Sequence, residues 1–137
     1  MTKHEFDWCD YYELAKSYSK EENEAKLRTG ISRFYNSCFC MSRNHLLKNK
    51  LFLNKKSKDI MNSTSPEVHK ETRNIFKKHP NLNYNKKGEK IFHELNDLRE
   101  YRNMVDYDEN NPQDIKYAYN SCKSKAKRIF ELLKELN

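Results

Sequence analysis

Glycine and proline are scarce in this sequence, whose 137 residues include 2 Gly and 3 Pro. An all-β fold of this length needs many tight turns, and these two residues supply the backbone conformations that such turns require. Helices need few of either residue. We therefore expect an all-α protein in which residues 1–137 form one domain, folded as an up-and-down bundle of about four to five helices.

Apolar residues recur at intervals of three and four residues in five segments, which is the period of an amphipathic helix. The second segment is the longest and is predicted to be the central helix of the bundle. Ser65 followed by Pro66 is typical of a helix N-terminus and marks the start of the third. The predicted helices span residues 7–19, 21–48, 66–79, 85–106 and 113–136.

Two stretches are predicted to be loops. Residues 48–65 are rich in Lys and Asn and have no clear period, and residues 80–84 begin with Pro80, before which the third helix should end. The acidic, Asn-rich residues 106–111 are expected to end the fourth helix, and Pro112 marks the start of the next.

The chain carries a formal net charge of +7, with 27 Lys and Arg against 20 Asp and Glu. Such a charge attracts polyanions, so nucleic acid is a candidate partner. Lys and Asn are frequent throughout the chain, however, and a solvated basic surface without a specific partner explains the charge equally well. Both interpretations stay open at this point.

The sequence has no membrane or metal signature. Its first ten residues are charged and lack an apolar run, and no stretch of about 18 apolar residues occurs, so we expect a cytoplasmic protein without a signal peptide or membrane span. The four cysteines lack the paired spacing of zinc ligands, and we expect them to be small buried residues. No cofactor is predicted.

A polar patch at the end of the predicted fourth helix carries the most information. At 100° per residue from Ile91, Arg102 falls at about 20° and Asp106 at about 60°, inside the apolar stripe, and Arg99 and Asn103 lie beside them. A charge in such a stripe costs several kcal/mol unless it is paired. One hypothesis is an ion pair of Arg102 and Asp106 that only braces the core. The other is a polar cleft where two helices or two subunits meet around a phosphate.

The segment from Arg102 to Asp108 reads Arg-Asn-x-x-Asp-Tyr-Asp and resembles the motif of HEPN domains (higher eukaryotes and prokaryotes nucleotide-binding), in particular a small prokaryotic branch. A second block, from Ser32 to Phe39 and on to Arg43 and Leu46, is similar to that branch's Ser-Arg-x-Tyr-Tyr-x-x-Phe helix and the segment after it. His69 resembles the branch's His before its third helix. The resemblance covers roughly residues 7–136.

This resemblance implies a helical bundle that dimerises, with the motif helices of two subunits facing each other across a composite cleft. Many HEPN proteins are metal-independent ribonucleases of toxin–antitoxin or antiphage systems, and the RNA's own 2′-hydroxyl is their nucleophile. The resemblance makes Arg102, Asp106 and Tyr107 candidate catalytic residues, and Arg99 and Asn103 candidate RNA-binding residues. The implied partners are RNA, a second copy of the chain, and an antitoxin or a nucleotidyltransferase that modifies the motif tyrosine, here Tyr107.

The sequence departs from the ribonuclease motif at one position. HEPN ribonucleases carry a His a few residues after the Arg, but no His lies within seven residues after Arg102. Asp106 and Tyr107 occupy that region, and their ordinary pKa values of about 3.9 and about 10 suit neither for proton transfer near neutrality without a large shift. A non-catalytic HEPN module that binds RNA, nucleotide or a partner protein is therefore the alternative. His45, His69 and His79 are candidates to reach the cleft from other segments.

Overall fold

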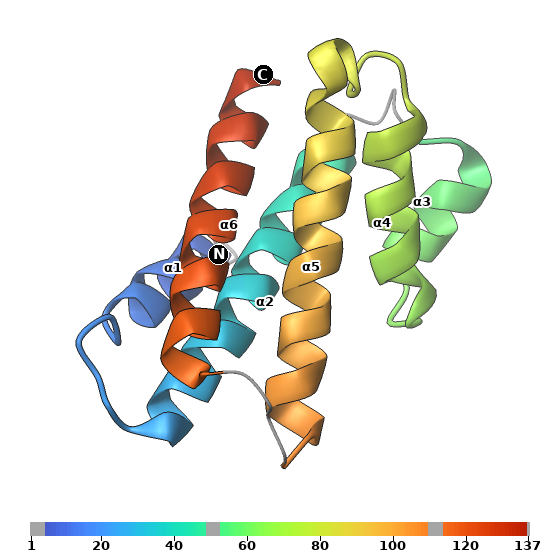
Figure 1. Ribbon diagram of the computed structural model, residues 1–137. Helices are drawn as coiled ribbons and strands as arrows, with labels where there is room; N and C mark the ends of the chain where they lie inside the picture. Colours follow the sequence, from blue (N-terminus) through green and yellow to red (C-terminus); the bar gives the residue numbers. More distant parts are fainter. Residues whose placement is uncertain (1–4, 49–52, 110–113, 137) are drawn as a thin grey trace.

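The computed structural model describes residues 5–48, 53–109 and 114–136, and these ranges form helices without a strand (Figure 1). The all-α prediction is thus confirmed. Pro112, the predicted start of the last helix, and the end of the acidic run before it lie outside the described residues. The elements are α1 (Cys9–Lys16), α2 (Glu24–Lys48), α3 (Lys55–Met61), α4 (Glu67–Lys78), the short 3₁₀ helix η2 (Tyr84–Lys86), α5 (Lys87–Tyr107) and α6 (Ile115–Glu135).

The long helix α2 is the centre of the bundle, as its length predicts. It packs against α1, α5 and α6 along much of its length and also touches α4. In Figure 1, α5 runs between α6 and α4 and antiparallel to both. Buried apolar side chains from all six helices form one continuous core, in which aromatic rings of α2 and α6, such as Phe34 and Tyr119, are fully buried.

The prediction of a long loop between the second and third predicted helices is wrong. Residues 48–65 are predicted to be a loop, but the structure places α3 there. The Asn54 side chain caps this helix by accepting a hydrogen bond of 2.8 Å from the Ser57 amide, and Leu53 and Met61 are buried at its two ends. A helix of seven residues is too short to display a hydrophobic period, which is why the pattern misses it.

The junction between α4 and α5 is unusually close. Asn85 and Lys86 adopt positive φ angles of 52° and 61°, and α5 begins only at Lys87, two residues later than predicted. Gly88 then passes so close to the end of α4 that a Cβ atom there would collide with the Phe76 carbonyl oxygen and lie 2.9 Å from that of Leu82. This contact fixes the position of α5 along α4.

Among the described residues no helix combines the length and the hydrophobicity that a membrane span needs. Three of the four cysteines, Cys38, Cys40 and Cys122, are buried as thiols in the core, and Cys9 is half-buried.

We predict that Gly88→Ala destabilises the protein. Alanine normally favours a helix by about 1 kcal/mol over glycine, but here its Cβ meets backbone oxygens, which cannot move like a flexible side chain. The free energy of unfolding should fall by about 2 kcal/mol in urea titrations. Glu100→Ala, an exposed site in the same helix, is the control and should change it by less than about 0.5 kcal/mol. Equal stability of both variants would contradict the close contact.

Candidate functional site

Side chains from α2, α4 and α5 meet where these three helices pack together. Within each helix they are spaced three or four residues apart, so each set projects from one helix face. We call this group the arginine cluster. It comprises Tyr35, Phe39 and Arg43 from α2, His69 and Arg73 from α4, and Arg99 and Arg102 from α5.

A hydrogen-bonded tyrosine–histidine pair lies at the centre of the arginine cluster. The Tyr35 hydroxyl oxygen and His69 Nδ1 are 2.6 Å apart. The His69 ring stacks on the buried Phe39 ring at a centroid distance of 4.1 Å. The imidazole is thus fixed by two contacts from α2.

The guanidinium groups surround this pair. Arg102 lies over the Tyr35 ring at 5.3 Å, and Arg43 lies over the Phe39 ring at 5.8 Å. Arg73 is almost fully buried, with 7% of its surface exposed. The charges of Arg99, Arg102, Arg73 and Arg43 all act on His69.

These four arginines carry buried N–H groups without a hydrogen-bond partner. The Nε of each, and Nη1 of Arg73, are inaccessible to solvent and unbonded. Within the described ranges, no carboxylate forms an ion pair or a hydrogen bond with any of the four guanidinium groups. Unpaired donors and uncompensated charges are costly to bury. The arrangement offers many donors and positive charge, and it therefore suits an anion with several acceptor oxygens.

The surroundings set the protonation states at the centre of the cluster. Burial first, and then the charges of Arg99, Arg102, Arg73 and Arg43, lower the pKa of His69 to about 4. Burial raises the pKa of Tyr35 to about 12, although the nearby arginines act in the opposite direction. Near pH 7, His69 is therefore neutral and Tyr35 keeps its proton.

The centre of the cluster also affects Arg73. Burial lowers the pKa of Arg73, while the nearby Tyr35 hydroxyl raises it. Tyr35 and His69 Nδ1 share one hydrogen bond, so Nε2 is the imidazole nitrogen that this bond does not use.

Some of the predicted site residues on α5 belong to the arginine cluster, and the others are exposed near the C-terminal end of the helix. Arg99 and Arg102 are half-buried in the cluster, whereas Asn103 and Asp106 are exposed and Tyr107, the last residue of α5, is 76% exposed. The Asp106 carboxylate accepts a 3.1 Å hydrogen bond from the Ser32 hydroxyl. It does not pair with Arg102, so the hypothesis of a bracing Arg102–Asp106 ion pair is wrong.

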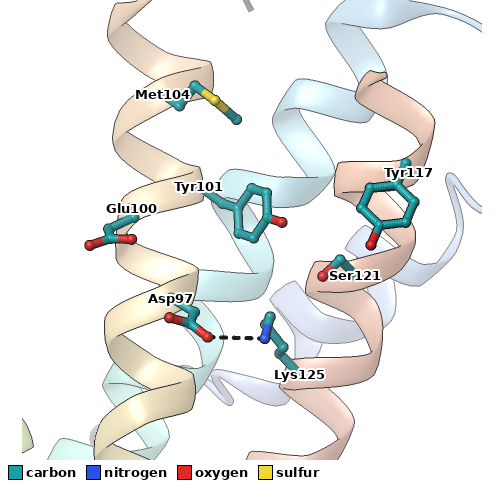
Figure 2. A pocket seen from close by; sticks show the side chains of 7 residues that line it. All are labelled: Asp97, Glu100, Tyr101, Met104, Tyr117, Ser121 and Lys125. Atoms are coloured by element: carbon teal, nitrogen blue, oxygen red, sulfur yellow. Dashed lines mark hydrogen bonds and ion pairs between the residues drawn. The ribbon is translucent and has the colours of Figure 1, made fainter. Parts of the chain in front are cut away.

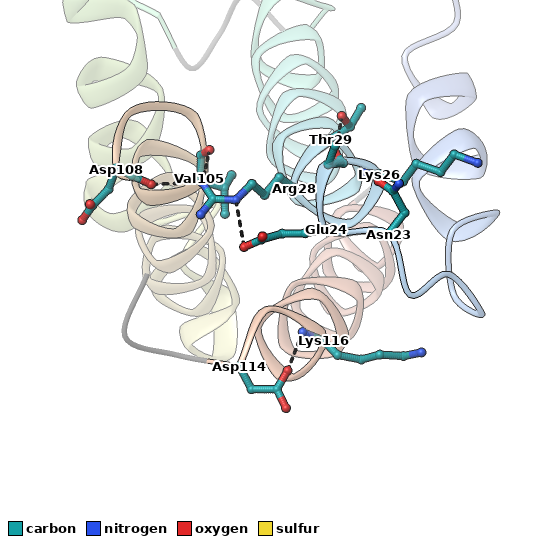
Figure 3. Close-up of polar contacts among 10 residues, drawn as sticks. Asn23, Glu24, Lys26, Arg28, Thr29, Val105, Asp108, Asp114 and Lys116 are labelled. Atoms are coloured by element: carbon teal, nitrogen blue, oxygen red, sulfur yellow. Dashed lines mark hydrogen bonds and ion pairs between the residues drawn. The ribbon is translucent and has the colours of Figure 1, made fainter. Parts of the chain in front are cut away.

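Arg28 of α2 fixes the C-terminal end of α5, which carries the motif. Its Nη1 donates to the carbonyl oxygens of Val105 at 2.8 Å and Asp108 at 3.0 Å (Figure 3). Its Nε also contacts the Glu24 carboxylate at 3.4 Å. The last carbonyls of a helix lack partners within the helix, so this arginine both satisfies them and positions Asp106 and Tyr107 beside α2.

Sequence reasoning missed part of the arginine cluster as a site. Tyr35, Phe39 and Arg43 belong to the second block of the HEPN resemblance, but the sequence pattern predicts no role for them or for Arg73. A usable signal existed, since Arg73 follows His69 by four residues and Arg43 follows Phe39 by four. Of the three histidine candidates, His69 contacts the cluster. His45 instead lies near Phe76, with ring centroids 6.1 Å apart, and His79 lines a surface hollow beside α3 and α4.

A separate pocket of about 480 Å³ lies between α5 and α6 (Figure 2). Tyr101 and Tyr117 line it, and Asp97 forms a 3.0 Å ion pair with Lys125 at one end. On a helical wheel, Asp97 lies about 160° from Arg99, so this pocket and the arginine cluster occupy opposite faces of α5. Its carboxylates make it unsuitable for a polyanion.

Comparisons of this chain with family models, curated proteins and solved structures find no match. The resemblance to HEPN domains therefore stays a prediction from the sequence.

We predict that Arg73→Met stabilises the protein in a low-salt chloride buffer. The change removes a buried charge that Arg99 repels and replaces it with an apolar side chain of similar length. The free energy of unfolding should rise by about 1 kcal/mol or more in urea titrations. Arg33→Met is the matched control, because Arg33 is a half-buried arginine on the Tyr11 ring, at 4.7 Å, outside the cluster. It should not be stabilising. A loss of stability in Arg73→Met would instead make Arg73 a structural brace.

We also predict a contribution of His69 to acid sensitivity. Its pKa is about 4 in the folded chain and about 6.5 when unfolded, so between these values the unfolded chain binds more protons. The free energy of unfolding therefore falls as the pH decreases from about 6.5 to about 4. His69→Gln should reduce this decrease, as measured by urea titrations at pH 7 and pH 4.5. Parallel pH profiles of the two proteins would contradict the buried, neutral imidazole.

Proposed function

We propose that this chain is a HEPN-type protein that acts on RNA as a metal-independent endoribonuclease, working as a homodimer in a toxin or antiphage role. The observation that carries the RNA-directed part is the arginine cluster, in which buried guanidinium donors have no acceptor within the described part of the protein. RNA supplies phosphate oxygens, which arginine binds through paired hydrogen bonds. The homodimer and the toxin or antiphage role rest on the sequence resemblance alone.

The three blocks that resemble HEPN sequences support the proposal by where their side chains lie. Tyr35 and Arg43 come from the second block, His69 is the isolated histidine, and Arg102 comes from the motif. These four residues, far apart in the sequence, belong to one cluster. If the three similarities arose by chance, we would not expect their residues to lie together at one charged site.

Two of the proposed catalytic residues lie one helical turn apart at the α2–α5 interface. Arg102 lies over the Tyr35 ring of α2. Asp106, one turn closer to the C-terminal end of α5, accepts the hydrogen bond from Ser32 of α2. Four residues of helix span about 6 Å, which allows one phosphodiester to reach both Arg102 and Asp106. In the proposal Arg102 stabilises the negative charge that develops on the phosphate, and Asn103, exposed on the same helix, donates to it.

The proposed reaction is an internal transfer. The 2′-hydroxyl oxygen attacks the adjacent phosphorus while its proton passes to the Asp106 carboxylate. The bond from phosphorus to the 5′ oxygen breaks, and this oxygen takes a proton from the Tyr107 hydroxyl. The products are a 2′,3′-cyclic phosphate and a 5′-hydroxyl end, and proton exchange with water then restores Asp106 and Tyr107. Tyr107 is exposed, so its hydroxyl is also accessible to the modifying partner that the resemblance implies.

A second candidate is a non-catalytic HEPN-type module that binds RNA or a nucleotide. One observation favours it: His69 Nδ1 is occupied by Tyr35, and the charged groups around this pair are guanidinium donors. A cluster of this kind binds an anion but does not by itself remove a proton from a 2′-hydroxyl.

We predict that the purified protein cleaves labelled single-stranded RNA in the presence of EDTA. Arg102→Ala and Asp106→Asn should each reduce the cleavage rate by about 100-fold or more, because one removes the charge that stabilises the phosphate and the other the proton acceptor. Arg33→Ala is the matched control and should cleave at the wild-type rate. Circular dichroism must show that Arg102→Ala is folded.

Three outcomes decide between the candidates. RNA that stays intact in every lane but binds the wild type, and not Arg102→Ala, would favour the non-catalytic module. Cleavage that Arg102→Ala retains would remove the site from the proposal. Unfolding of Arg102→Ala would make that residue a structural one.

A further inference from the structure

The arginine cluster contains more positive charge than an internal phosphodiester can neutralise. Four guanidinium groups act on one imidazole, and in the described part of the chain no carboxylate is paired with them. A phosphodiester carries one negative charge. A terminal phosphate carries about 1.5 to 2 negative charges at pH 7 and offers three strong acceptor oxygens. The second ligand matches the cluster better in both charge and acceptors.

The burial of the guanidinium donors also favours a terminal phosphate as the ligand. Arg73 lies deepest, with 7% of its surface exposed, and its Nε and Nη1 have no partner. Arg43, Arg99 and Arg102, which flank the central pair, are half-buried and each has a buried, unbonded Nε. A continuous nucleic acid chain must enter and leave a site, whereas a chain end needs only one open side. A recessed donor set is therefore suited to a terminus.

The neutral His69 is compatible with this match. Its Nδ1 is hydrogen-bonded to Tyr35, and near pH 7 the pair adds no negative charge among the guanidinium groups. The groups that face His69 are Tyr35 and Arg43 from α2, Arg73 from α4, and Arg99 and Arg102 from α5. None of these is an acid that would repel a dianion.

We propose that Arg43, Arg73, Arg99 and the Tyr35–His69 pair form a binding site for a phosphomonoester dianion, the terminal phosphate of an RNA or a nucleotide. The proposal rests on the proposed RNA-directed function and names the part of the RNA that the cluster recognises. Arg102 borders this site and the exposed Asp106 lies one helical turn beyond it, so a bound end would place a neighbouring phosphodiester at the proposed catalytic residues. The phosphate is an anchor and undergoes no reaction.

The test is a competition experiment with short 2′-O-methyl oligoribonucleotides, which cannot be cleaved through their 2′-oxygen. Unlabelled competitors with a 5′-phosphate, a 3′-phosphate or hydroxyl groups at both ends displace a labelled oligonucleotide from the wild-type protein in EDTA, and a nucleoside monophosphate serves as the free ligand. We expect one phosphorylated end to compete at least about 10-fold better than the hydroxyl ends. The two phosphorylated competitors distinguish which end is bound, and the monophosphate distinguishes a nucleotide from an RNA end.

Two variants link any preference to the cluster. Arg73→Met and Arg43→Gln should abolish the advantage of the phosphorylated end, while Arg33→Met should keep it. A separate readout is the titration of the His69 imidazole by NMR: inorganic phosphate should raise its pKa by at least about one unit in the wild type and in Arg33→Met, and not in Arg73→Met. If one variant fails to fold, the other still provides the comparison.

Equal competition by all ends, or an undiminished preference in both variants, would overturn the proposal. The outcome is separable from that of the ribonuclease assay. Cleavage of internal bonds without any end preference would leave the proposed function standing and remove the anchor. A phosphorylated-end preference without cleavage would support the anchor and favour the non-catalytic candidate.

Discussion

The repulsion among four arginines is the interaction on which the interpretation of this protein depends. Arg43, Arg73, Arg99 and Arg102 converge on His69, and some of their buried donors have no acceptor among the residues that the structure describes. Burial of like charges destabilises a fold unless a partner neutralises them. The rest of the structure compensates through an aromatic and aliphatic core that joins all six helices. A group of residues that destabilises an otherwise well-packed fold is typical of a ligand site.

The Tyr35–His69 pair couples the charge of the arginine cluster to the protonation of an imidazole. Burial, and after it the same four charges that attract an anion, keep His69 neutral by lowering its pKa to about 4. A bound phosphate would offset those charges and make protonation of the imidazole easier. The cluster therefore responds to its ligand through a measurable group, and anion binding and proton affinity at His69 are coupled.

Contacts at both ends of α5 fix the positions of the candidate site residues. Gly88 sets α5 along α4, which aligns Arg99 and Arg102 with His69 and Arg73. At the other end of α5, Arg28 holds the last carbonyls against α2 and thereby places Asp106 beside Ser32. The motif residues thus lie along one helix but in two environments, a half-buried cationic one and an exposed one.

The sequence by itself determined the all-α class, the central position of α2 and the polar interruption of the stripe at Arg102, because these follow from periodicity and composition. It did not determine α3, whose two turns carry too few apolar positions to show a period. Nor did it determine the partner of Asp106, since a spacing of four residues allows an ion pair with Arg102 but tertiary packing supplied Ser32 instead. The convergence of Arg73 and His69 with the motif arginines was decided only by the tertiary structure, because it depends on how α4 packs against α2 and α5, and no local pattern specifies that contact.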